Sequence, residues 1–311
     1  MTESQRIEML ELPKGKVSVV LDTDTACEVD DQFAVAYAVR SAEAGQIVLE
    51  GIHATQFGDN PADAMERSYQ EIHKVLDLMG STAYKNIVYR GAAKKMKKNE
   101  PVMSEAVEHL IALAKDETRE GPLYVVSIGA ATNIASALMI APEIMEKIVV
   151  VWLAGNVLHW NHVAEYNMNQ DMVAAKYIFD CGVPLVLMPA MNVVSALSIS
   201  VYELEYFLNG KNDLCTFLYE NVCRYANKYS AQNSAWTKVI WDIAGIAYVL
   251  NPEKWFITRL VPTPILQTPK DCPGWQWMVR WESDPTRHTM RIGDFVERDM
   301  IFGDVFDKLL K

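Results

Sequence analysis

Residues 17–40 constrain this chain more than any other stretch, because they combine a buried strand, a cluster of acids and a helix. The apolar, β-branched run Val17–Leu21 is typical of a parallel strand that is covered on both faces. Apolar residues then recur at helical spacing from Phe33 to Ala38, which predicts a helix beginning near residue 30. Four acids accompany these two elements: Asp22, Asp24, Asp30 and Asp31.

Four carboxylates gathered where a strand ends repel one another, so a positive charge must lie among them or some must stay protonated. A bound divalent cation satisfies this requirement, and open α/β sheets bind their ligands at this end of the strands. A purely structural reading is also possible. Asp30 would cap the helix, Asp31 would favour its dipole, and Asp22 and Asp24 would serve as turn residues. That reading explains one or two acids better than four, and we favour a functional site.

Composition limits the class of protein. Of the 311 residues, 50% are hydrophobic and 22% are charged, as in a soluble globule with a sizeable core. The net charge of -11 argues against nucleic acid and anionic membranes as partners. The five cysteines form no CxxC pair, so we expect reduced thiols and a cytoplasmic protein. We see no signal peptide, membrane span or linker, and expect a single domain over residues 1–311.

The rest of the chain alternates between strand-like and helix-like segments without internal repeats. This pattern predicts an α/β fold with a doubly wound, mainly parallel, Rossmann-like sheet and helices on both faces. Strands are expected at 17–21, 47–55, 87–89, 123–128, 148–153 and 185–188, with β-like runs at 256–260 and 276–281. Helices are expected at 61–79, from Ser104, from about 132 to 142, at 172–181, from Ser200, at 213–229, at 236–250 and at the end of the chain.

Asp242 is an isolated acid in the apolar segment 236–250. Burying a carboxylate there is costly unless the group is paired or bound to a metal, so Asp242 is a second candidate ligand. The alternative is a helix N-cap. A third group of polar residues lies in the long loop 154–170, where Asn161, Glu165 and Asn167 offer amide and carboxylate groups that suit sugar hydroxyls. These side chains could equally satisfy the backbone of their own loop.

Together these motifs resemble the nucleoside hydrolase family of the inosine-uridine-preferring type. The family opens with a strand and DxDPGxDD, where this chain has DTDTACEVDD. Its AEFN appears here as AEYN at residues 164–167, and its GxLTNIA as GAATNIA at residues 129–135. The sequence IWDIA around Asp242 matches the family's late aspartate. The similarity spans residues 17 to about 250.

The resemblance implies a nucleoside hydrolase-like fold and Ca²⁺-dependent hydrolysis of the N-glycosidic bond of ribonucleosides, or of a related N-ribosyl compound, to ribose and free base. It implies that Asp24, Asp31, Asp242 and the backbone carbonyl of Thr132 hold the cation, and that Asp24 activates a metal-bound water. Ribose would be bound by Asp30, Asn161, Glu165 and Asn167, with Asp22 in support and Asn60 as a further candidate. The partner is then a small-molecule nucleoside, and the family resemblance suggests a homodimer or homotetramer.

Two departures from the family pattern matter. The Pro-Gly turn is missing, and two extra residues separate Asp24 from Asp30, so the cation loop must bulge. Many members also place a histidine before the late aspartate to protonate a leaving purine, whereas Trp241 stands here. Either the base leaves unaided or another residue donates the proton. The candidate donors are Lys238, Tyr229, His159 and His162, and Trp160 and Trp236 are candidates for stacking on a base.

Two alternative functions stay open. The run LDTDT also fits the opening of haloacid-dehalogenase-like Mg²⁺ phosphatases, in which the first aspartate is the nucleophile, and GDVFD at residues 303–307 could supply their late acidic pair. That reading leaves Asp30, Asp31, AEYN and Asp242 without a role. The missing histidine motivates the other alternative, a protein that binds ribose and calcium without turnover.

Overall fold

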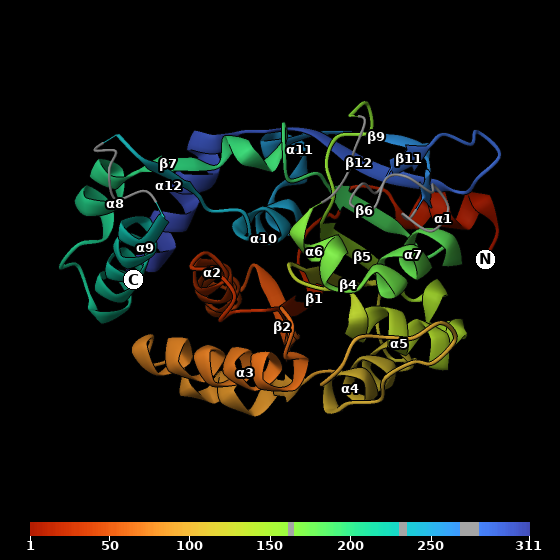
Figure 1. Cartoon of the computed structure of the whole chain (residues 1–311), viewed down its shortest axis with the longest axis horizontal. Helices are drawn as coiled ribbons and strands as arrows, with labels where there is room; N and C mark the ends of the chain where they lie inside the picture. The colour runs from red at the N-terminus through yellow and green to blue at the C-terminus, as the bar shows by residue number, and fades with distance from the viewer. Residues whose placement is uncertain (161–164, 230–234, 268–279) are drawn as a thin grey trace.

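The computed structural model describes residues 1–160, 165–229, 235–267 and 280–311. One eight-stranded sheet forms its centre, in the order β3-β2-β1-β4-β5-β6-β12-β9 (Figure 1). All neighbouring pairs are parallel except β12 and β9, which run antiparallel at one edge. The strands are β1 Val17–Thr23, β2 Ile47–Ala54, β3 Val88–Arg90, β4 Leu123–Ser127, β5 Ile148–Leu153, β6 Leu185–Met188, β9 Phe256–Pro262 and β12 Thr289–Val296. The predicted doubly wound, mainly parallel α/β fold is confirmed.

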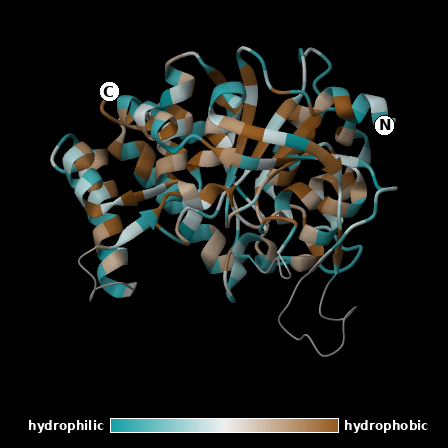
Figure 2. Cartoon of the chain, turned by 90° about the horizontal axis from the view of Figure 1, so that it is seen from above, coloured by the Kyte–Doolittle hydropathy of each residue, from teal (hydrophilic) through white to brown (hydrophobic). Residues whose placement is uncertain are grey.

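Helices cover both faces of this sheet, and alternate residues of β5 show why. Val149 and Val151 enter one apolar core, which also contains residues of α2 Asp31–Glu43, α10 Ile243–Leu250 and α12 Arg298–Leu309. Val150 and Trp152 enter the other core, against α4 Glu105–Ala114, α5 Thr132–Ile140 and α7 Met172–Cys181. Because successive side chains of a strand point to opposite faces, the two cores lie on opposite sides of the sheet. Hydrophobic residues accordingly gather on the central strands (Figure 2).

The remaining elements frame this centre. They are α3 Pro61–Leu78, η1 Thr82–Ile87, η2 Pro142–Glu146, α6 Tyr166–Gln170, η3 Val194–Ala196, β7 Ser198–Ser200, α8 Val201–Leu208, α9 Asp213–Tyr229, β8 Thr237–Val239, β10 Ile265–Gln267, α11 Pro252–Trp255 and β11 Arg280–Glu282. Within the described residues, no helix has the length and apolar character that crossing a membrane requires. The single-domain organisation stays a prediction.

The helix ends predicted from the sequence are confirmed where their caps can be seen. Ser104 caps α4 by accepting a hydrogen bond from the Val107 amide. Asp171 caps α7 through the Ala174 amide at 3.1 Å, and Gly182 ends that helix with a φ of 85°, a conformation that favours glycine. Ser200 forms the predicted capping box at the start of α8.

Three segments differ from the prediction. Residues 236–250 are not one helix. Their first part contains β8, which pairs antiparallel with β7, and α10 begins only after Asp242. The long loop after β5 contains the short helix α6. Strand β12 was not expected, because Gly293 and Asp294 interrupt its apolar pattern and the register shifts between Gly293 and Phe295. Most of the β-like run 276–281 lies outside the described residues.

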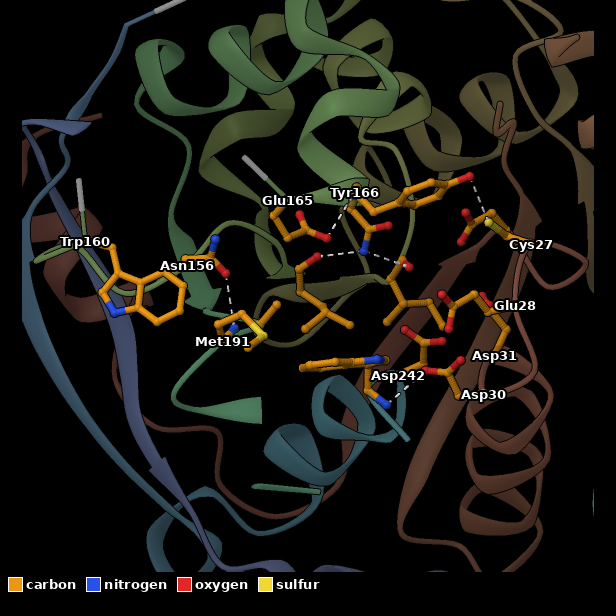
Figure 3. Close-up of a pocket in the computed structure, with 16 residues that line it drawn as sticks. Cys27, Glu28, Asp30, Asp31, Asn156, Trp160, Glu165, Tyr166, Met191 and Asp242 are labelled. Atoms are coloured by element: carbon orange, nitrogen blue, oxygen red, sulfur yellow. Dashed lines mark hydrogen bonds between the residues drawn. The ribbon is translucent and has the colours of Figure 1, made fainter. Parts of the chain in front are cut away.

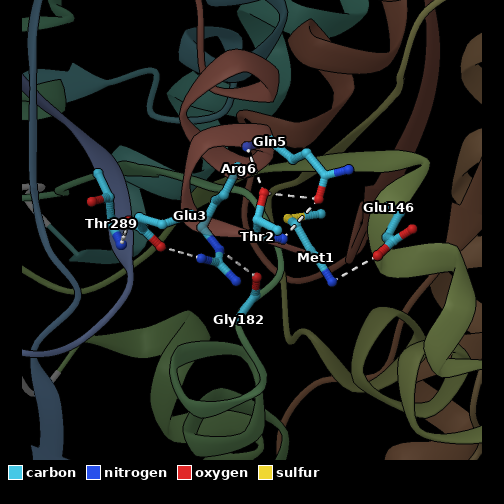
Figure 4. Close-up of polar contacts among 8 residues, drawn as sticks. All are labelled: Met1, Thr2, Glu3, Gln5, Arg6, Glu146, Gly182 and Thr289. Carbon is cyan, nitrogen blue, oxygen red and sulfur yellow. Dashed lines mark hydrogen bonds and ion pairs between the residues drawn. The ribbon is translucent and has the colours of Figure 1, made fainter.

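Helix α1, Glu3–Met9, ties the start of the chain to the body of the molecule (Figure 4). Arg6 is buried and donates a hydrogen bond from Nε to the Gly182 carbonyl at 2.8 Å. Glu3 pairs with Arg6 and accepts a hydrogen bond from the Thr289 amide at 2.8 Å. Helix α1 thereby links the end of α7 to the start of β12.

Candidate active site

A cavity of about 330 Å³ lies at the carboxyl ends of the central strands (Figure 3). Asp24 follows β1, Ile128 follows β4, Asn156 follows β5 and Met191 follows β6, and all four line the cavity. Asp242, which precedes α10, completes the wall. This is the position where open α/β sheets bind their ligands.

The predicted acids meet in this cavity from distant parts of the chain. Asp24, Asp30, Asp31 and Asp242 all line it and are all at least 95% buried. The Thr23 hydroxyl donates a hydrogen bond to Asp31 at 2.6 Å. The structure therefore brings the first acid cluster and the late aspartate to one place.

Burial and mutual repulsion make this cluster electrostatically unfavourable. Burial, followed by the charge of Asp31, raises the pKa of Asp24 well above its usual range. Burial and the charge of Asp30 raise the pKa of Asp31 to about 7. Burial and the same charge of Asp30 also raise the pKa of Asp242. A bound cation would remove this repulsion, since it favours the ionised form of each carboxyl group.

The donor set fits a hard divalent cation. The Oδ2 atom of Asp24 is buried and has no hydrogen-bond partner, which marks a place where a ligand can be accepted. Gly129 leaves room beside this carboxylate, because a Cβ atom there would lie 2.8 Å from Asp24 Oδ1. Within the described residues, no three His, Cys, Asp or Glu side chains form an arrangement that could already coordinate an ion. Binding would require Asp24, Asp31 and Asp242 to turn their oxygens toward one point.

Asp30 is more tightly held than the sequence suggested. Its Oδ1 accepts a hydrogen bond from the Lys238 ammonium at 3.1 Å, and its Oδ2 accepts one from the Trp241 amide at 2.9 Å. Lys238 also contacts Glu28 at 2.7 Å and donates to the Val239 carbonyl at 2.8 Å. Burial opposes the charge on Lys238, but Asp30 and Glu28 more than offset it, so the pKa of Lys238 lies above its usual range. This lysine is a fixed cation rather than a proton donor.

Glu165 and Asn167 both line the cavity from the start of α6. Glu165 caps this helix, and its carboxylate accepts hydrogen bonds from the Asn167, Met168 and Gly155 amides at 2.9, 3.2 and 3.0 Å. Burial raises the pKa of Glu165 to about 7 against these donors. Asn167 donates from Nδ2 to the Ile128 and Leu153 carbonyls at 3.1 and 2.9 Å. The side chains of Glu165 and Asn167 thus satisfy local backbone and also line the cavity, and their binding of sugar hydroxyls stays a prediction.

Thr132 does not reach the cavity, which corrects its expected place as a cation ligand. It is the first residue of α5, its side chain is buried, and its hydroxyl donates to Asp171 at 2.9 Å. Four residues earlier, Ile128 follows β4 directly and does line the cavity. Asp22 does not line the cavity and accepts a hydrogen bond from Asn133 at 2.7 Å, so its supporting role stays a prediction.

Several other candidates lie elsewhere. Asn60 is exposed before α3, and His159 is exposed; neither lines the cavity. Trp236 packs against the apolar core, whereas Trp160 lines the cavity. Three candidates lie outside the described residues: Asn161, His162 and the side chain of Tyr229.

Sequence reasoning missed a contact between two departures from the family pattern. Cys27 belongs to the extended cation loop, and Tyr166 replaces the phenylalanine of AEFN. The Cys27 thiol donates to the Tyr166 hydroxyl at 3.2 Å, and both residues line the cavity (Figure 3). The only sequence signal was that both positions differ from the motif, and the contact itself joins residues 139 positions apart.

The phosphatase alternative finds no support. Its late acids belong to α12, where Asp304 accepts a hydrogen bond from Tyr37 and pairs with Lys308, and Asp307 is exposed. Neither acid lines the cavity that contains Asp24.

Comparison with known proteins agrees with this geometry. The pyrimidine-specific ribonucleoside hydrolase RihA of Salmonella paratyphi A is 27% identical over 157 residues, which cover 49% of this chain and 50% of that protein. The match thus spans about half the length of that relative. RihA of Escherichia coli O1:K1 / APEC is 26% identical over 262 residues, covering 76% of this chain and 80% of the relative.

The fold comparison covers more of the chain. The purine-preferring ribonucleoside hydrolase from Gardnerella vaginalis matches with a TM-score of 0.72 and 21% identity, over 94% of this chain and 98% of that one. A family model described as inosine-uridine preferring nucleoside hydrolase matches residues 19–302. The protein therefore belongs to the inosine-uridine preferring nucleoside hydrolase family, a family of hydrolases that act on N-glycosyl bonds.

Proposed function

We propose that this protein hydrolyses the N-glycosidic bond of ribonucleosides, or of related N-ribosyl compounds, with Ca²⁺ bound in the cavity. The observation that carries the proposal is the meeting of Asp24, Asp31 and Asp242 in one cavity, with an unpartnered buried oxygen on Asp24. Carboxylate and carbonyl oxygens are hard ligands, and a flexible set of them favours Ca²⁺ over Mg²⁺. We further propose that the Ile128 carbonyl takes the ligand role expected of Thr132, since Ile128 follows β4 and lines the cavity, whereas Thr132 does not line it.

Each cavity residue then has a defined task. Breaking an N-ribosyl bond builds positive charge on the sugar, which the surrounding carboxylates stabilise. Asp24 accepts a proton from the attacking water, and Asp30, Glu165 and Asn167 hold the ribose hydroxyls, with Asn161 as a further candidate. When bound, the cation would orient those hydroxyls and lower the pKa of the water. The homodimer or homotetramer that the family resemblance suggests, and the cytoplasmic location expected from the cysteines, stay predictions.

Release of free ribose from a nucleoside panel, measured with Ca²⁺ and with a chelator, tests the proposal. We expect turnover that depends on Ca²⁺, and an Asp24→Asn variant that loses at least about 10²-fold in kcat because its general base is gone. Asp304→Asn, which changes an acid away from the cavity, is the matched control. Near-normal turnover in the Asp24→Asn variant would contradict the assignment of the base.

The second candidate is a ribose- and calcium-binding protein without turnover. Trp241, in the place of the family's histidine, is the observation that favours it. Calorimetry with ribose in the presence of Ca²⁺ separates the two candidates. Binding without any release of ribose from nucleosides would favour the second.

A further inference from the structure

The cavity has an acidic end and an aromatic end (Figure 3). Glu28, Asp30, Asp31 and Asp242 lie together on one side, and Trp160 and Met191 lie on the other. Trp241 also lines the cavity, next to the acids, because its amide donates to Asp30 at 2.9 Å. If the acids hold the sugar, Trp160 is left to face the base.

The described lining of the cavity is strongly acidic. Among its described lining residues are six acids and no lysine, arginine or histidine. The nearest described cation is Lys238, which contacts Glu28 and Asp30 from behind the wall. The field therefore attracts cations and repels anions such as phosphates.

At the aromatic end, no described lining side chain carries an acidic proton for a departing base. The Cys27 thiol and the Tyr166 hydroxyl, which hydrogen-bond to each other, lie on the acidic side (Figure 3). Trp241 stands where the family's histidine would be, and its amide donates to Asp30. The Lys238 ammonium is held by Glu28, Asp30 and the Val239 carbonyl. The carboxylate of Glu165 is an acceptor for three backbone amides. A base that departs without taking a proton suits this wall best.

We propose that the preferred substrates are nucleosides whose base is already a cation, with N-ribosylpyridinium compounds as the chemical class; this rests on the proposed function. Water bonds through its oxygen to C1′ as the C1′–N bond breaks. The electron pair of that bond returns to the ring nitrogen and converts the pyridinium into a neutral pyridine, and Asp24 takes the proton of the water. Trp160 provides an indole face, which attracts cationic rings.

The test compares kcat/KM for nicotinamide riboside, uridine and inosine with Ca²⁺ present. Two reference compounds need no proton on departure. Nicotinic acid riboside keeps the pyridinium but adds a carboxylate, and p-nitrophenyl riboside is neutral. We expect nicotinamide riboside to exceed uridine, inosine and nicotinic acid riboside by at least about tenfold, the lower limit of typical electrostatic focusing. Raising the salt from 20 mM to about 0.5 M should lower its kcat/KM while that of p-nitrophenyl riboside stays nearly constant.

Two variants test whether the acidic end of the cavity causes this substrate preference. Glu28→Gln removes one negative charge from the acidic end, so it should lower kcat/KM for nicotinamide riboside severalfold and weaken its salt dependence. Glu117→Gln is the matched control, because this exposed acid lies in the segment before β4, at the opposite end of the strands. Uridine or inosine turning over as fast as nicotinamide riboside would overturn this inference and leave the proposed function standing. Turnover of p-nitrophenyl riboside alone, which has no N-glycosidic bond, or no turnover of any compound would overturn both.

Discussion

The Lys238 ammonium makes three contacts of 3.1 Å or less in the wall of the site, to Glu28, Asp30 and the Val239 carbonyl. Asp30 is 1% exposed, so its charge cannot be balanced by water. The Lys238 ammonium therefore offsets part of the cost of burying the Asp30 carboxylate next to Asp31 and Asp242. A residue that motif comparison would pass over thus holds one acid of the site in place.

We predict that Lys238→Met destabilises the protein by about 3–5 kcal/mol, because it leaves a buried carboxylate without its partner. The double variant Lys238→Met/Asp30→Asn should lose less, since neither charge remains. Urea unfolding of both variants in the presence of a chelator measures the difference. Equal losses in the two variants would show that packing, rather than charge pairing, is the role of Lys238.

At the scale of elements, the backbone just after β4, at Gly129, packs closely against the side chains of Thr55 and Asp24. A Cβ atom on Gly129 would lie 2.6 Å from Thr55 Cγ2 and 2.8 Å from Asp24 Oδ1. Glycine at this position therefore allows β4 to lie against the carboxylate that follows β1. The close packing of two strand ends fixes where Asp24 can point.

We predict that Gly129→Ala weakens Ca²⁺ binding by about tenfold or more, because relieving such overpacking costs about 1–3 kcal/mol and must displace Asp24. Gly303→Ala is the matched control, since a Cβ atom on Gly303 in α12 would meet no atom within 4 Å. That control should keep its Ca²⁺ affinity and gain about 0.5–1 kcal/mol from its helix. Calorimetric titration of both variants with Ca²⁺ gives the comparison, and an unchanged affinity for Gly129→Ala would contradict the prediction.

Elements with a clear period or cap were predictable from the sequence. The strand predicted at Val17–Leu21 continues slightly further in the structure, to Thr23, and α7 has its predicted bounds. Strand β12 was not predictable, because its place between β6 and β9 depends on tertiary pairing rather than on an uninterrupted apolar pattern. The same distinction holds in the site. Asp242 was found because a lone acid in an apolar segment is costly, whereas a backbone carbonyl such as that of Ile128 leaves no sequence signal.

Contacts between residues far apart in the sequence could not be predicted either. Lys238 meets Asp30 across 208 positions of sequence, and nothing in either local segment indicates the other. Sequence reasoning therefore located the acids of the site, and the structure was needed to identify the groups that hold them.

For the whole molecule, several buried acids make stability depend on pH. Burial raises the pKa of Asp22, Asp31 and Glu165 each to about 7, from ordinary values of 3.8, 3.8 and 4.5. Between about pH 4 and 7 the folded form thus binds more protons than the unfolded chain. The stability these groups contribute is fully present below their unfolded pKa values, and it is lost as the pH rises through about 7.

We therefore predict that the melting temperature of the chelator-treated protein falls between pH 5 and pH 8, in addition to any effect of its net charge of -11. Ca²⁺ should raise the melting temperature more at pH 8 than at pH 5, because at pH 5 protons compete for the same carboxylates. Asp22→Asn separates the pH dependence caused by the buried acids from the stabilisation by Ca²⁺. Since Asp22 lies outside the cavity, this variant should flatten the pH dependence while keeping the gain from Ca²⁺. A calcium effect of equal size at both pH values would mean that the ion binds away from these acids.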